Sequence, residues 1–188
     1  RYFTAQCELR KGAGTQGEID KIKLLMEKSG IGIQNRKVVA AANTKAELTG
    51  EPAAAIELPD GTIVTGKTSE LLGASSAMLL NSLKILAGLD DSVKLITPEI
   101  IEPIMQLKTE KLGGNNPRLH IDEILIALTI CARTDENTKL AMDQLDKLKG
   151  CEVHSSVILS NVDESTFKKL GVNLTCSPVY QTNKLFHK

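Results

Sequence analysis

The sequence contains no tryptophan, and aromatic residues make up only 3% of its 188 residues. Proteins that bind single-stranded nucleic acids stack the bases on aromatic side chains within a basic groove. This chain has few aromatic residues for such a surface, and its 23 Lys and Arg residues are balanced by 23 Asp and Glu residues. Without a net positive charge, attraction to nucleic acid or to an anionic membrane is weak. We therefore expect neither kind of partner.

Long apolar segments and paired cysteines are also lacking. The longest apolar stretch, Ile124 to Ile130, is interrupted by Thr129 and is much shorter than a bilayer span. The first residues do not have the pattern of a signal peptide, and we expect none. The four cysteines form no C-x-x-C pair and are far apart, at Cys7, Cys131, Cys151 and Cys176. We therefore expect reduced thiols and a cytoplasmic protein.

Apolar periodicity and glycine stops predict a helix-rich chain. Helices are expected over residues 2–11, 18–29, 37–48, 75–87, 98–112, 121–132 and 140–148. Val38 and Val39 leave a strand as an alternative at the start of the third helix. Apolar runs over 53–58 and 62–65 flank a Pro-Asp-Gly turn and predict a β-hairpin. Two further strands, over 152–159 and 172–176, enclose a short helix and favour a parallel crossover.

The predicted fold class is therefore mixed α/β, helix-rich, with a small mixed sheet made of the β-hairpin and the C-terminal strand-helix-strand unit. We expect the helix over 121–132 to be central to the core, since it is too apolar for a surface element. The helix over 140–148 should pack against it as a hairpin. Asp163 can cap the short helix between the last strands, with Val162 and Phe167 as a hydrophobic staple. The polar tail over 177–188 is expected to dock or fray.

The segment Gly61 to Thr68 matches the phosphate-loop pattern G-x-x-x-x-G-K-[ST]. A phosphate loop needs backbone N–H groups that curl around the phosphate between a buried strand and a helix start. Here Ile63 and Val64 are typical of a strand, and Gly61 belongs to the preceding turn. Lys67 then follows a hairpin strand, so the context disfavours a phosphate loop.

A weaker anion site remains in the same region. Small polar residues precede or open the helix over 75–87, where free N–H groups favour anions. The candidate anion or phosphate contacts are Lys67, Thr68, Ser69, Ser75 and Ser76. The alternative is an ordinary capped helix start with no ligand.

Other groups of reactive residues are weaker candidates. Cys151 and His154 are three residues apart, but strand alternation places them on opposite faces, so we expect no metal site. His120, Asp122 and Glu123 cluster at the start of the apolar helix and could supply an acid or base, although carboxylates there also complement the helix dipole. The sequence identifies no catalytic residue and no cofactor.

Several long segments resemble one bacterial family over nearly the whole chain. They are RYFTAQCE (residues 1–8), GEPAAAIELPDGTIVTGKTSELLGASSAMLLNSLKILAGL (50–89), LHIDEILIALTICA (119–132), KLKGCEVHSSVIL (147–159) and KKLGVNLTC (168–176). The chain is similar to the C-terminal part of the family called domain of unknown function 1846, also known as uncharacterised protein family 0371. The resemblance implies a complete protein roughly two to three times as long. Its other half would be similar to a nucleotide-binding α/β domain, so nucleotide chemistry is expected there first.

We accordingly expect residues 1–188 to form a single C-terminal domain, with a helical lead-in over 1–50 and a main α/β body over 51–188. The leading hypothesis is a module that completes a cleft with a preceding N-terminal domain of the same protein, or that supports self-association. The alternative is an enzyme domain that binds a phosphorylated small molecule or nucleotide through the anion contacts named above. A scaffold that binds another protein would instead expose a large apolar patch.

Overall fold

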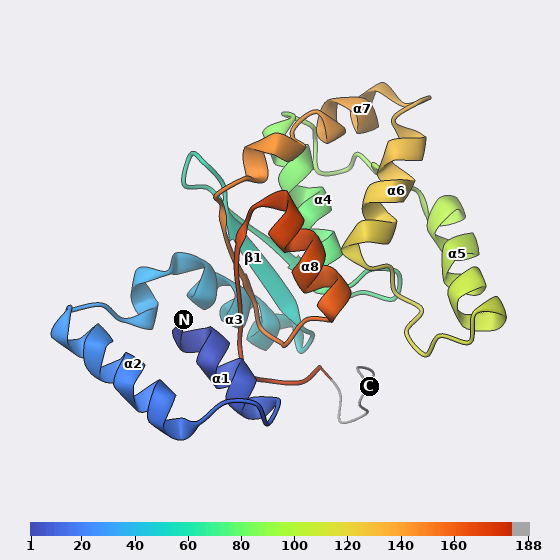
Figure 1. The fold of residues 1–188 in the computed structure, drawn as a ribbon. Coiled ribbons are helices and arrows are strands. Elements are labelled where there is room, and N and C mark those ends of the chain that lie inside the picture. The colour runs from blue at the N-terminus through green and yellow to red at the C-terminus, as the bar shows by residue number, and fades with distance from the viewer. Residues whose placement is uncertain (182–188) are drawn as a thin grey trace.

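A four-stranded sheet lies at the centre of the computed structural model, which describes residues 1–181 (Figure 1). The strands are β1 (Ala53–Glu57), β2 (Ile63–Lys67), β3 (Glu152–Ser155) and β4 (Asn173–Cys176), in the order β2-β1-β3-β4. β1 pairs antiparallel with both β2 and β3, whereas β3 and β4 are parallel. The predicted mixed sheet, made of a hairpin and a C-terminal strand-helix-strand unit, is confirmed.

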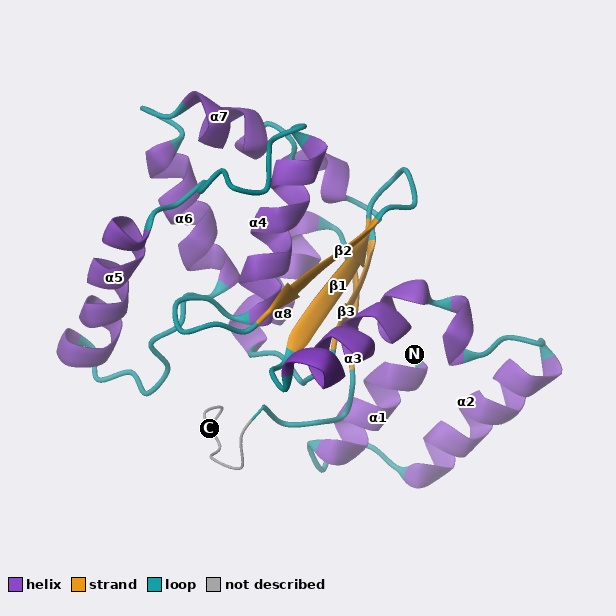
Figure 2. Cartoon of the chain, turned by 180° about the vertical axis from the view of Figure 1, so that it is seen from behind, coloured by secondary structure: helices purple, strands orange, loops and turns teal. Residues whose placement is uncertain are grey.

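Helices cover both faces of this sheet (Figure 2). The helices of the described chain are α1 (Tyr2–Arg10), α2 (Gln16–Lys28), α3 (Lys37–Thr49), α4 (Ala74–Leu86), α5 (Pro98–Gln106), α6 (Ile121–Cys131), α7 (Glu136–Met142) and α8 (Asn161–Leu170). Three short helical turns accompany them: η1 (Ile33–Asn35), η2 (Leu107–Lys111) and η3 (Leu145–Leu148). α3 lies on one face, and α4 and α8 lie on the other (Figure 2).

The central strand β1 is buried on both faces, which explains its almost uninterrupted run of alanines. Ala54 and Ile56 belong to the large core beneath α4, α6 and α8. Ala55 points the other way and packs against Val38 and Ala42 of α3. The alternative of a strand at Val38 and Val39 is therefore wrong, because both residues lie in α3 and Val38 packs on the sheet from this helix.

The predicted helix over 140–148 is not continuous. Asp135 caps α7 by accepting a hydrogen bond from the Thr138 N–H at 2.6 Å. The helix ends at Met142, and the chain continues into η3, a 3-10 turn that buries Leu148 completely. The strand expected over 152–159 is also shorter, because the chain leaves the sheet after Ser155.

The helix α6 packs with α7 as expected, but it is not buried all round. Ile121, Ile124 and Leu128 lie in the core, whereas Ile126 and Ile130 are 62% and 63% exposed. The expectation of a central core helix is therefore only half right. Apolar residues occupy both sides of α6, and α4, α7 and α8 cover one of them.

The short helix α8 begins earlier than predicted. Ser160 is its N-cap, and the Ser160 hydroxyl accepts a hydrogen bond from the Asp163 N–H at 3.1 Å. Asp163 is thus not the cap, and its carboxylate is available for other partners. Gly171 ends the helix in the left-handed conformation, with a φ of 75°, as predicted.

The beginning of the polar tail docks on the body. Ile158 donates its N–H to the carbonyl of Val179, and the Tyr180 hydroxyl donates to the carbonyl of Arg10. The rest of the predicted tail, residues 182–188, lies outside the described residues. Among residues 1–181, no helix has both the length and the apolar character needed to cross a membrane.

Candidate anion-binding site

A cavity of about 330 Å³ lies beside the N-terminus of α4. Segments far apart in the sequence form its walls: the end of α1, the start of α4, the loop before α6, and the segment that joins β3 to α8. Its polar lining residues include Arg10, Thr68, Ser75, Arg118 and His120. The fold therefore gathers cationic and hydroxyl side chains around one helix start.

The start of α4 is not capped by a side chain. Its N-cap residue is Gly73, which has no side chain to accept a hydrogen bond from the first turn. The first N–H groups of an α-helix have no partner inside the helix, and they carry partial positive charge. The alternative expected from the sequence, a helix start capped by a side chain, is therefore not present at Gly73. The first turn of α4 lies at the cavity, since Gly73, Ala74 and Ser75 all line it.

Ser75 provides the most specific feature of the cavity. The residue is only 4% exposed, and its Oγ has no hydrogen-bond partner within the described structure. Buried hydroxyl groups are almost always hydrogen-bonded, because an unpaired one loses its bonds to water. The neighbouring Ser76 is satisfied, since its hydroxyl donates to the Leu119 carbonyl at 3.0 Å. Ser75 thus has an unfilled hydrogen-bonding capacity at the helix start.

Two arginines give the cavity a positive character. The Nε of Arg118 donates to the Ser69 carbonyl at 2.7 Å, which holds the side chain beside the β2–α4 connection. The guanidinium of Arg10 lies 5.6 Å from the ring centre of Tyr180. Within residues 1–181, neither guanidinium forms an ion pair with a carboxylate. Both charges are therefore available to a ligand.

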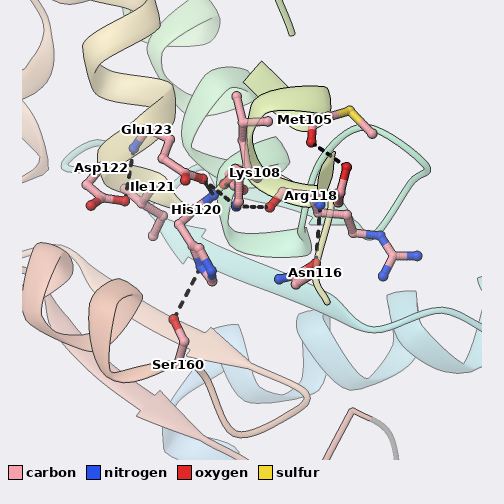
Figure 3. A network of polar contacts seen from close by, with 12 residues as sticks. Met105, Lys108, Asn116, Arg118, His120, Ile121, Asp122, Glu123 and Ser160 are labelled. Atoms are coloured by element: carbon pink, nitrogen blue, oxygen red, sulfur yellow. Dashed lines mark hydrogen bonds and ion pairs between the residues drawn. The ribbon is translucent and has the colours of Figure 1, made fainter. Parts of the chain in front are cut away.

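A polar network fixes the loop between Arg118 and α6 (Figure 3). Lys108 donates to the Arg118 carbonyl and to Oε2 of Glu123, both at 2.7 Å. The same Glu123 oxygen accepts the His120 N–H at 2.7 Å. Glu123 and Asp122, which were candidate acids, thus serve the helix start, since Asp122 accepts the Glu123 N–H. The network holds the backbone that presents Arg118 and His120 to the cavity.

The imidazole of His120 is oriented by α8. Its Nδ1 lies 3.0 Å from Oδ2 of Asp163 and 3.3 Å from Oγ of Ser160. Asp163 also accepts the Ile121 N–H at 2.9 Å and the Ser160 hydroxyl at 2.9 Å. The Asp163 carboxylate, which does not cap α8, therefore lies at the cavity wall with hydrogen-bond partners on both of its oxygens.

His120 and Asp163 each favour the charged form of the other. The hydrogen bond that His120 donates to Asp163 raises the pKa of His120, even though burial opposes the shift. Burial would raise the pKa of Asp163, but the hydrogen bonds from His120, Ile121 and Ser160 outweigh it and lower that pKa. An imidazolium facing a carboxylate is therefore favoured, and the Asp163 charge is neutralised within the site.

The structure brings together three of the five predicted anion contacts. Thr68, Ser75 and Ser76 line the cavity, whereas Lys67 and Ser69 do not. Lys67 is exposed at the end of β2. The Ser69 hydroxyl accepts the Leu72 N–H at 3.1 Å and so belongs to the turn that leads into α4.

The phosphate-loop match forms a hairpin strand, as its context indicated. Gly61 lies in the turn with a φ of 85°, and Ile63 to Lys67 form β2. A Cβ on Gly66 would come within 2.1 Å of the Met78 nitrogen. This glycine therefore allows α4 to approach the sheet and does not cradle a phosphate.

The sequence reasoning missed Arg10, Arg118 and Asp163 as members of the site. Arg10 and Arg118 match no motif, and only the tertiary fold brings them to α4. The other weak candidates are not assembled: Cys151 donates its thiol to the Lys147 carbonyl, whereas His154 contacts Thr175 and Ser177.

Comparison with known proteins identifies the family. Residues 34–186 match the family model described as "Domain of unknown function DUF1846, C-terminal". The chain belongs to the DUF1846 family. The whole chain is 51% identical over 188 residues to the UPF0371 protein of Corynebacterium diphtheriae and 49% identical to that of Streptococcus pyogenes serotype M5. Each match covers the whole chain but only 38% of the relative's length. The predicted resemblance is thus confirmed.

Proposed function

We propose that this DUF1846 domain is a ligand-binding module whose cavity holds the anionic group of a small molecule, such as a phosphate ester. The observation that carries the proposal is the unpartnered Ser75 hydroxyl at the uncapped start of α4. An oxyanion there would accept hydrogen bonds from Ser75 and from the free N–H groups of the helix. Arg10 and Arg118 would neutralise its charge.

The remaining lining residues support a small organic ligand. The cavity includes apolar residues such as Val157, Ile158 and Leu159 alongside its polar groups. Ligand sites commonly combine apolar walls with a few placed polar groups, and their volumes start at about 300 Å³. The volume of about 330 Å³ therefore fits one small phosphorylated molecule.

We further propose that the preceding part of a longer protein completes the cleft. The chain spans 38% of the length of the relatives it matches, and residues 1–33 precede the matched C-terminal family model. Within the described chain, α2 packs mainly against α1 and leaves Leu24 and Leu25 exposed. Since Arg10 at the end of α1 lines the cavity, a body seated on α1 and α2 would lie next to the ligand.

We propose a cytoplasmic location, because the four cysteines are free and thiols stay reduced in the cytoplasm. We propose no nucleic-acid partner, because acidic and basic residues are equal in number and the chain carries no net positive charge. Self-association would be a further use of the exposed apolar residues, and sedimentation of the chain in solution would measure it.

The anion-binding proposal is tested by thermal-shift and calorimetric titration with inorganic phosphate and pyrophosphate at constant ionic strength. Binding should raise the melting temperature of the chain. Ser75→Ala and Arg118→Ala should each weaken binding about tenfold, as expected for a lost hydrogen bond to a charged group.

Two matched variants serve as controls. Ser82→Ala removes another buried hydroxyl of α4, whose partner is the Met78 carbonyl, and Arg133→Ala removes an exposed positive charge outside the cavity. Both should leave binding unchanged. Equal loss in the control variants, or no binding by the unmodified chain, would refute the proposal.

A further inference from the structure

His120 has one ring nitrogen that the protein leaves available at the cavity. Its Nδ1 is directed at Asp163 and Ser160, and within residues 1–181 Nε2 has no hydrogen-bond partner. His120 lines the cavity that also contains Ser75 and Arg118. An oriented imidazole with a free Nε2 is a group that can bind a ligand or exchange a proton with it.

The arrangement differs from that of a serine hydrolase. In a Ser-His-Asp triad the serine faces one ring nitrogen and the aspartate faces the other. Here Ser160 and Asp163 share Nδ1, and the Ser160 hydroxyl donates to Asp163 at 2.9 Å. Ser160 therefore helps to orient the carboxylate, and the functional end of this group is Nε2 of His120.

We propose that His120 is a ligand-binding residue that, as an imidazolium, donates a hydrogen bond from Nε2 to a tetrahedral oxyanion held at the start of α4. The inference rests on the anion-binding function proposed above. The proton that completes the imidazolium comes from solvent, so that anion binding and proton uptake are coupled. Protonated His120 would add a third cation to the two arginines.

The charges around His120 favour this state. Asp163 on α8 and Glu123 on α6 favour the protonated ring, whereas Lys108 on η2 opposes it. Arg118, which precedes His120 in the same loop, adds positive charge to the cavity. The hydrogen bond to Asp163 dominates and raises the pKa of His120. A bound anion at Nε2 would raise this pKa further, because it favours the charged ring.

Calorimetric titration with sulfate tests the inference, because sulfate remains a dianion over the whole range used. In titrations between about pH 5.5 and 8.5, sulfate affinity should be level below the pKa of His120 and should fall as the pH rises through it, by about tenfold in all, as for the loss of one hydrogen bond from a charged group. Titrations in buffers of different ionisation enthalpy should show the uptake of up to one proton.

Two variants separate a ligand contact from a structural role. His120→Gln keeps an amide donor but cannot titrate, so its sulfate affinity should be independent of pH and its proton uptake zero. Asp163→Asn keeps the shape of the partner but removes the charge that favours the imidazolium. Its affinity should begin to fall at a lower pH than in the unmodified chain.

An imidazole NMR titration of the unmodified chain gives a second measurement if a variant fails to fold. The chain has three histidines, and the His120 signal should titrate at a higher pH when sulfate is present. Sulfate binding without pH dependence, proton uptake or a shifted His120 signal would overturn the inference and leave the anion site intact. No sulfate binding at pH 6 would overturn both proposals.

Discussion

Gly66 of β2 and Met78 of α4 lie in such close contact that a Cβ on the glycine would come within 2.1 Å of the Met78 backbone nitrogen. Backbone atoms cannot move aside as a flexible side chain can. This contact sets the position of α4 on the sheet, and therefore the position of the helix start that carries Ser75.

Gly66→Ala should therefore lower the free energy of unfolding by about 3 kcal/mol or more, since the helix must shift from the sheet. Gly17→Ala is the matched control, because Gly17 lies in α2 and a Cβ added there would meet no other atom within 4 Å. That variant should be neutral or stabilising by up to about 1 kcal/mol. Chemical denaturation measures both, and equal stabilities would contradict the role of Gly66.

Lys67→Ala should leave phosphate and pyrophosphate binding unchanged, because Lys67 does not line the cavity. A genuine phosphate loop would instead lose most of its affinity without this lysine. The same titrations that test Ser75 decide between the two, and a large loss in Lys67→Ala would move the anion site to the end of β2.

The His120–Asp163 pair should stabilise the fold most between about pH 4 and 6.5. The raised pKa of His120 gives stability that is complete below its ordinary value and is lost as pH rises through the folded value. The lowered pKa of Asp163 gives stability that is complete above its ordinary value and is lost as pH falls through the folded value. Asp163→Asn should cost about 1–3 kcal/mol near pH 6 and less outside this window.

Denaturant melts of Asp163→Asn at several pH values measure this window. Asp146→Asn removes an exposed carboxylate that accepts no hydrogen bond among residues 1–181, so its effect should be small at every pH. A cost for Asp163→Asn that stays constant from pH 4 to 9 would show that the charges of the pair do not matter.

His154 should make the fold sensitive to acid. It is fully buried between Thr175 and Ser177, and burial, helped by Arg36, lowers its pKa to about 4. The unfolded chain binds this proton from about pH 6.5 downward, so stability is complete above pH 6.5 and falls toward pH 4. The expected loss is roughly 3 kcal/mol.

His154→Asn should be less stable than the unmodified chain at pH 7 but should show a flatter decline between pH 6.5 and 4. The slope against pH is the informative quantity, because loss of packing alone would shift the whole curve. Parallel curves for the two proteins would assign the acid sensitivity to other groups.

The two faces of α6 should respond very differently to truncation. Ile124 is completely buried, so Ile124→Ala should cost about 2–5 kcal/mol. Ile126 is 62% exposed, so Ile126→Ala should change stability by less than about 0.5 kcal/mol in this chain. Denaturation of both variants measures the difference, and similar costs would mean that the exposed face is covered in solution.

The sequence by itself determined the local structure. The Pro-Asp-Gly turn specified the hairpin, and Gly50 and Gly171 ended their helices in the left-handed conformation, because these signals act over a few residues. It also located the start of α4 as a region of small polar residues. The family of the chain could also be recognised from the sequence, because long collinear segments are more specific than any short motif.

Only the tertiary structure decided the site. Serine and aspartate are both favourable N-cap residues, so the sequence allowed either Ser160 or Asp163. In the structure the segment after β3 places Ser160 at the cap, and the Asp163 carboxylate contacts His120 instead. Arg10 and Arg118 reach the same cavity through packing between distant elements, which periodicity cannot register. For the same reason, the apolar pattern of α6 could not show which face the neighbouring helices would cover.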